Sequence, residues 1–141
     1  MRLRCLTVAQ VLLMSVASVL LFLGLHDSAV VIVAERGRTL RGGVGWGIAV
    51  YLATYIFALL VLLQNVVALY WPAKRVRSAI LAWLVFAMAL TALFNPFGSW
   101  AHPYRFMLLL LCAAIGFFLS WMGQSLWHLW RQRCLSDSPV G

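Results

Sequence analysis

Four long runs of apolar residues, separated by short polar segments, set the pattern of this chain. The runs cover residues 5–25, 44–71, 78–94 and 106–127, and the uncharged stretch 46–71 holds only Gln64 and Asn65 as strongly polar side chains. A helix of that length spans roughly 39 Å, more than the ~30 Å hydrocarbon core of a bilayer. The pattern predicts an all-α integral membrane protein, with four transmembrane helices bundled into one membrane domain over residues 1–141.

The polar segments predict the connections of this bundle. Residues 26–43 and 95–105 are expected to form loops on the outer side of the membrane, and residues 72–77 a tight inner loop. Pro72 suits the first turn of the third helix, where its missing N–H costs nothing. The Asn-Pro-Phe-Gly sequence at 95–98 is a strong helix breaker. Residues 131–141 are expected to form a C-terminal tail that is disordered from Cys134 onward.

Two interpretations of the first outer loop are open. Residues 29–34 are rich in β-branched side chains and are followed by a glycine-containing turn and a second short segment up to Gly43. This order predicts a short β-hairpin on the membrane surface, which would need packing support because an isolated hairpin is marginally stable. The alternative is that the first helix continues with a kink to Ala34.

The charged residues predict the orientation of the bundle. The formal net charge is +8, but the basic residues lie in short clusters between the apolar runs, as topology determinants and contacts to anionic lipid head groups do. One side carries Arg2, Arg4, Lys74, Arg75, Arg77, Arg131 and Arg133, and the other carries Arg36, Arg38, Arg41 and Arg105. The excess on the first side predicts cytoplasmic termini in a multi-pass inner or plasma membrane protein. Nucleic acid is not an expected partner.

The residue types argue against catalysis in this protein. No Asp, Glu, Lys or Arg lies inside the predicted spans, whereas ion-coupled carriers keep an ionisable group at membrane depth despite a cost of roughly 2.5–3.5 kcal/mol. The cysteines are far apart without a CxxC pair, and the histidines lie at span ends. This distribution predicts no metal site, no haem or other cofactor, and no enzyme.

Four amide side chains form the one group of polar residues that stands out within the spans. By residue count, Gln10, Gln64, Asn65 and Gln124 lie on three helices at a similar depth, roughly 8–10 Å below the inner interface. Amides in hydrocarbon bond to one another, with about 0.6 kcal/mol per interhelical hydrogen bond on average. We predict a polar cluster that sets the helix register. The alternatives are a site for a partner helix or polar ligand, and amides that reach toward water.

Small residues recur along one face of the fourth span. Cys112, Gly116, Ser120 and Gly123 follow one another at helical spacing. Such a stripe lets two membrane helices approach closely, and it predicts a helix-packing face. Ser15 and Ser18 share a face of the first span, and their small hydroxyls are expected to serve packing as well.

These observations favour a non-catalytic membrane protein that acts by protein–protein interaction. It would be an accessory subunit of a membrane complex or an immunity-type protein against a membrane-acting toxin. The expected contact is the first outer loop, whose Arg36, Arg38 and Arg41 would meet an acidic partner surface or, alternatively, only lipid head groups. A second hypothesis is a subunit of a small homo-oligomeric transporter or channel. The expected partners are membrane lipids and either another membrane protein or further copies of the chain.

Overall fold

The computed structural model describes residues 2–37, 43–97 and 103–136, which are almost entirely helical. Four long helices follow one another: α1 (Arg2–Glu35), α2 (Val44–Tyr70), α3 (Arg75–Phe97) and α4 (Pro103–Ser136). A 3-10 turn, η1 (Pro72–Lys74), connects α2 to α3 and begins with the proline expected there. Each of the four long helices is long and apolar enough to cross a membrane. These helices make the chain an all-helical, multi-pass membrane protein.

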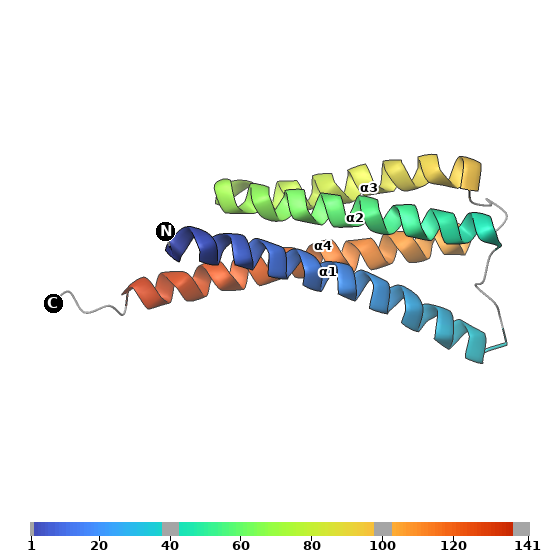
Figure 1. Cartoon of the computed structure of the whole chain (residues 1–141), viewed down its shortest axis with the longest axis horizontal. Helices are drawn as coiled ribbons and strands as arrows, with labels where there is room; N and C mark the ends of the chain where they lie inside the picture. Colours follow the sequence, from blue (N-terminus) through green and yellow to red (C-terminus); the bar gives the residue numbers. More distant parts are fainter. Residues whose placement is uncertain (1, 38–42, 98–102, 137–141) are drawn as a thin grey trace.

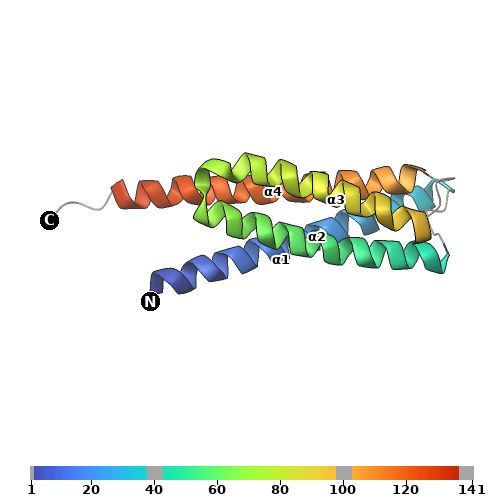
Figure 2. The same ribbon diagram turned by 90° about the horizontal axis from the view of Figure 1, so that it is seen from above.

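The helices form an antiparallel bundle in which consecutive helices pack side by side (Figure 1 and Figure 2). α1 also packs against α4, and α2 contacts α4 across the interior. The N-terminus of α1, the η1 turn and the C-terminus of α4 lie at one end of the bundle, which we call the terminal end (Figure 1). The opposite end, where α1 and α3 end and where α2 and α4 begin, is called the loop end.

Large apolar side chains cover the outside of the bundle. Leu13, Leu20, Leu59 and Met88 are each more than half exposed, and they come from three different helices. Contiguous apolar surface of this extent would favour aggregation in water. Lipid tails are as apolar as leucine, so the same surface is at no disadvantage in a bilayer.

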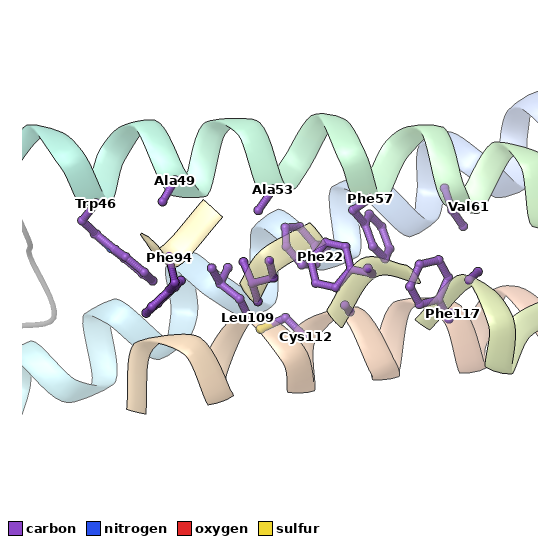
Figure 3. Close-up of a cluster of buried hydrophobic side chains, with 14 residues drawn as sticks. Phe22, Trp46, Ala49, Ala53, Phe57, Val61, Phe94, Leu109, Cys112 and Phe117 are labelled. Carbon is purple, nitrogen blue, oxygen red and sulfur yellow. The ribbon is translucent and has the colours of Figure 1, made fainter. Parts of the chain in front are cut away.

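One phenyl ring from each helix meets the others near the middle of the bundle. Phe22 and Phe57 stack with 4.5 Å between ring centroids, and the Phe117 ring lies 4.9 Å from Phe57 (Figure 3). Phe86 of α3 closes the group edge-on, with its centroid 6.1 Å from that of Phe57. All four rings are buried, and such stacked and edge-on contacts are favourable beyond the area they bury. The rings therefore tie all four helices together at one level.

A second aromatic layer lies toward the loop end. The buried Trp46 ring packs edge-on against Phe94 with 5.9 Å between centroids, and Phe106 packs against Phe94 at 5.1 Å (Figure 3 labels Trp46 and Phe94). The guanidinium of Arg105 lies 5.5 Å from the Trp46 ring centroid, at the distance of a cation–π contact. The arginine therefore adds a charged group to the aromatic layer at the loop end.

No hairpin forms in the described part of the first outer loop. Residues 29–34 are helical, because α1 continues through them to Glu35. The alternative of a continuing helix therefore holds there, and the hairpin does not. Extending an existing helix through β-branched residues costs only about 0.5 kcal/mol each, whereas an isolated hairpin is marginally stable at best. Gly37, with a φ of 74°, donates its N–H to the Ala34 carbonyl at 3.0 Å and ends the helix. The rest of the expected hairpin, residues 38–42, lies outside the described part.

Three helices are longer than the predicted spans. α3 begins at Arg75 and continues through Asn95 and Pro96 to Phe97, so the sequence expected to break the helix lies partly within its last turn. α1 continues past residue 25, and the His26 ring lies 6.4 Å from that of Trp46, near the start of α2. Asp27 is 79% exposed and follows His26 on the outside of the bundle. α4 continues to Ser136, which makes residues 131–136 helical and not part of a tail. Arg133 in the last turn favours this extension through the helix dipole.

Candidate functional site

A hydrogen-bonded polar cluster joins α1, α2 and α4 in the terminal half of the bundle. Its centre is Asn65 of α2, which is 1% exposed. The Asn65 Nδ2 donates to Ser15 Oγ at 2.8 Å, and the Asn65 Oδ1 accepts from Ser120 Oγ at 2.7 Å and from Gln124 Nε2. One buried amide side chain thus links three helices.

Gln64 makes a separate contact, although it adjoins Asn65 in sequence. The Gln64 Nε2 donates to the backbone carbonyl of Phe117 at 3.3 Å. The Gln64 Oε1 is buried without a hydrogen-bond partner among the described residues. The four predicted amides are therefore divided: Asn65 and Gln124 bond to each other, and Gln64 ties α2 to the backbone of α4.

A cavity of ≈ 220 Å³ lies between the helices at the terminal end. Gln10 of α1, Asn65 of α2 and Gln124 of α4 lie in its wall, so three of the four predicted amides meet there. The basic residues of the wall are Arg75 of α3 and His128 and Arg131 of α4. No Asp or Glu is among the described wall residues. The cavity therefore combines amides with positive charge.

Two residues of the cavity wall each have one polar atom that is buried without a hydrogen-bond partner in the described part of the chain: Gln124 Oε1 and Arg75 Nε. The Gln124 side chain as a whole is 8% exposed. Its carbonyl oxygen accepts hydrogen bonds, whereas the guanidinium nitrogen donates. Buried polar atoms are almost always paired, so this wall is suited to a small polar ligand or to ordered water.

The small-residue stripe of α4 faces the bundle interior. Its members are Cys112, Gly116, Ser120 and Gly123. A Cβ added at Gly116 would lie 2.6 Å from Cζ of Phe57, so the backbone of α4 lies directly against the Phe57 ring of α2. At Gly123 the nearest atom would be Sδ of Met14 at 3.0 Å, on α1. The stripe therefore packs against two different helices, and Ser120 also takes part in the Asn65 cluster.

Of the three arginines predicted to bind a partner, one lies in the part of the chain that the structure describes. Arg36 is exposed directly after the end of α1, at the loop end. Arg38 and Arg41 lie outside the described residues. Arg36 thus presents a positive charge at the end of the bundle opposite to the cavity.

A tyrosine pair on the lipid-facing side of α2 was missed by the sequence analysis. Tyr51 and Tyr55 are 61% and 59% exposed, and their hydroxyl oxygens lie 2.9 Å apart. Both line a groove of ≈ 540 Å³ between α1 and α2. The signal was present in the spacing, because residues four apart on a helix lie on the same face. The grouping of Arg75, His128 and Arg131 was also missed, since it depends on how α3 packs against α4.

Neither metal chemistry nor known relatives narrow the function further. Within the described residues no three His, Cys, Asp or Glu side chains lie together in a way that could hold a metal ion. Comparisons of the chain with protein-family models, curated proteins and solved structures found no match. The function is therefore argued from the polar cluster, the cavity and the tyrosine pair.

Proposed function

We propose that this chain is a non-catalytic membrane protein that binds a transmembrane helix of another protein in the groove between α1 and α2. The observation that carries the proposal is the exposed tyrosine pair, Tyr51 and Tyr55, on the lipid-facing side of α2. An accessory subunit of a membrane complex and an immunity-type protein would both act in this way.

The depth of the two tyrosines supports a protein partner. α2 has 27 residues, so its midpoint is near Phe57, and the Cα atoms of Tyr55 and Tyr51 lie roughly 3 and 9 Å from it along the axis. Both distances are within the ~15 Å half-thickness of the hydrocarbon. Two hydroxyls share one hydrogen bond, which leaves the second O–H without an acceptor among the described residues. Leaving a buried hydroxyl without a hydrogen bond costs about 1–3 kcal/mol in proteins, and an interhelical hydrogen bond in a membrane recovers about 0.6 kcal/mol on average. A partner helix with an acceptor at this depth provides such a bond.

The groove beside the tyrosines suits a helix. Its α2 wall includes Gly47, Thr54 and Ala58, and its α1 wall includes Val19 and Leu23. Small side chains let the backbones of two membrane helices approach closely, where dispersion contacts accumulate. The groove therefore offers a packing surface on either side of the polar pair.

The charge at the loop end favours a different protein over a second copy. Arg36, Arg38 and Arg41 follow α1 directly in sequence, so a helix in the groove would leave the membrane near them. The chain has 11 basic and only 3 acidic residues, and a second copy would offer few carboxylates to these arginines. A partner with acidic residues next to its transmembrane helix is complementary in charge.

Photocrosslinking in native membranes tests this proposal. A photoreactive amino acid is placed at Leu59, one turn from Tyr55 on the exposed side of α2, or at Met88 on the exposed side of α3 as a matched control. We expect a discrete adduct with another protein from Leu59 but not from Met88. Adding Tyr51→Phe and Tyr55→Phe should lower the yield of the Leu59 adduct several-fold, because phenylalanine keeps the ring and removes the hydroxyl.

The same adduct tests the arginines of the loop. Changing Arg36, Arg38 and Arg41 to serine should lower the adduct yield while the amount of protein in the membrane stays the same. Adducts with lipid alone, or only with a differently tagged copy of the chain, would overturn the proposal. An adduct unaffected by the two phenylalanine changes would remove the tyrosine pair as its basis.

A further inference from the structure

The geometry points to a ligand site that is separate from the helix-binding groove. The cavity at the terminal end binds an anionic phosphate ester that also carries a hydroxyl or amino group. The head group of an anionic phospholipid and a free glycerol phosphate share this chemistry. The site does not depend on the proposed function, because the groove lies between α1 and α2 nearer the loop end and shares no wall residue with the cavity.

The position of the cavity suits a molecule from the membrane interface. Asn65 and Gln124 form its deep part, next to the buried polar cluster. Arg131 follows Gln124 by seven residues on α4, which is roughly 10 Å along the helix toward the terminal end. Arg75 is the first residue of α3 at the same end. The wall thus changes from amides at depth to cations near the head-group region.

The outer part of the cavity is selective for an anion. Two guanidinium groups, from Arg75 and Arg131, share the wall with the imidazole of His128, and none of the described wall residues is acidic. Guanidinium groups are always charged and offer a planar set of donors that matches the oxygens of a phosphate. The Arg75 Nε is one such donor, buried and without a partner among the described residues.

The deep part of the cavity requires a donor on the same ligand. Gln124 Oε1 is a buried acceptor without a partner in the described part of the chain, and a fully ionised phosphate has no hydrogen to give it. An alcohol or amine attached to the phosphate supplies that hydrogen. The cavity of ≈ 220 Å³ also exceeds by more than tenfold the roughly 10–15 Å³ that a single water needs. A polar head group therefore fits the available space, and it pairs Gln124 Oε1 and Arg75 Nε once these side chains turn toward it.

Native mass spectrometry of the purified protein tests this site. The protein in neutral detergent is titrated with phosphatidylglycerol or, for comparison, zwitterionic phosphatidylcholine. Changing Arg75 and Arg131 to glutamine should weaken phosphatidylglycerol binding at least about tenfold, because charge-assisted hydrogen bonds are lost. The matched control changes Arg77 and Arg133 to glutamine, which removes the same charge from exposed positions outside the cavity wall. The control should weaken binding less than about threefold.

A second comparison tests the donor requirement. Phosphatidylmethanol has the same singly charged phosphodiester without a hydroxyl group, so wild-type protein should prefer phosphatidylglycerol, and Gln124→Leu should remove that preference. The ratio of the two affinities is measured within each variant, which keeps a change in stability from mimicking the effect. Equal affinities in wild-type protein would overturn the donor part of the inference.

Soluble glycerol phosphate distinguishes the two sources of the ligand. Displacement of phosphatidylglycerol by glycerol phosphate would identify a site open to free esters, and binding of the lipid alone would identify a lipid head-group site. Both results support the inference when they depend on Arg75 and Arg131. Equal losses in the cavity and control variants, or equal binding of phosphatidylglycerol and phosphatidylcholine, would show that the cavity holds only water.

Discussion

Two glycines of α4 allow the packing of this bundle to be tested with one chemical change. A Cβ at Gly116 would lie 2.6 Å from Cζ and 3.1 Å from Cε2 of Phe57, closer than packed carbon atoms approach. That ring cannot move freely, because it is fully buried between Phe22, Phe86 and Phe117. At Gly123 the added Cβ would meet the thioether of Met14, which is flexible and can turn aside.

The expected changes in unfolding free energy follow from these two environments. Replacing glycine by alanine in a helix gains about 0.8–1 kcal/mol at either position, because alanine loses less backbone entropy. Overpacking a well-packed core costs typically 1–3 kcal/mol, and we expect this cost only at Gly116. Gly116→Ala should therefore be less stable than Gly123→Ala by about 1–3 kcal/mol. Gly116→Leu should be worse than Gly116→Ala.

Reversible unfolding in mixed micelles with a denaturing detergent measures the difference, with tryptophan fluorescence as the signal. A Phe57→Leu background provides the control, since leucine lacks the ring atoms that an added Cβ would meet. There the cost of Gly116→Ala should largely disappear, although Phe57→Leu itself destabilises the core. Equal unfolding free energies for the two alanine variants would refute the close approach of α4 to α2.

Two further predictions concern the polar cluster and the topology. Asn65→Leu removes three interhelical hydrogen bonds and should lower the unfolding free energy by about 2 kcal/mol. Gln64→Leu removes one such bond and should lower it by about 0.6 kcal/mol. Equal losses for the two variants in the micelle assay would argue against Asn65 as the centre of the cluster. The basic residues near the terminal end predict that this end faces the cytoplasm. Alkaline phosphatase is active only outside the cytoplasm, so a fusion after Gly141 should be inactive and a fusion after Gly42 should be active. The reverse pattern would invert the predicted orientation.

The polar cluster shows which contacts can be predicted by counting residues along each predicted helix. Counting positions from the span ends placed Gln10, Asn65 and Gln124 at one level, and these residues do line one cavity. Counting could not separate Gln64 from Asn65, because neighbours on a helix point about 100° apart and only packing decides what each one meets. It also treated Ser15 and Ser120 as packing residues, whereas both hydrogen-bond to Asn65.

In the first outer loop, local sequence preferences predicted the wrong secondary structure. Its β-branched residues suggested strands, but propensity is a weak preference and an existing helix extends at low cost. Residues 29–34 therefore continue α1, and Gly37 ends it. The helix continuation was recognised as an alternative, yet nothing in residues 29–34 themselves decides between the two.

The amino-acid sequence by itself determined four helices that are long and apolar enough to cross a membrane, their order, and the position of each polar side chain along its helix. The reason is that apolar length and residue position along a helix are one-dimensional quantities. Only the tertiary structure decided which faces meet: the four phenyl rings at the centre, Gly116 against Phe57, Asn65 among three helices, and the cations of α3 and α4 around one cavity. Those contacts depend on the rotation and relative position of each helix, which are set by side-chain packing between segments far apart in the chain.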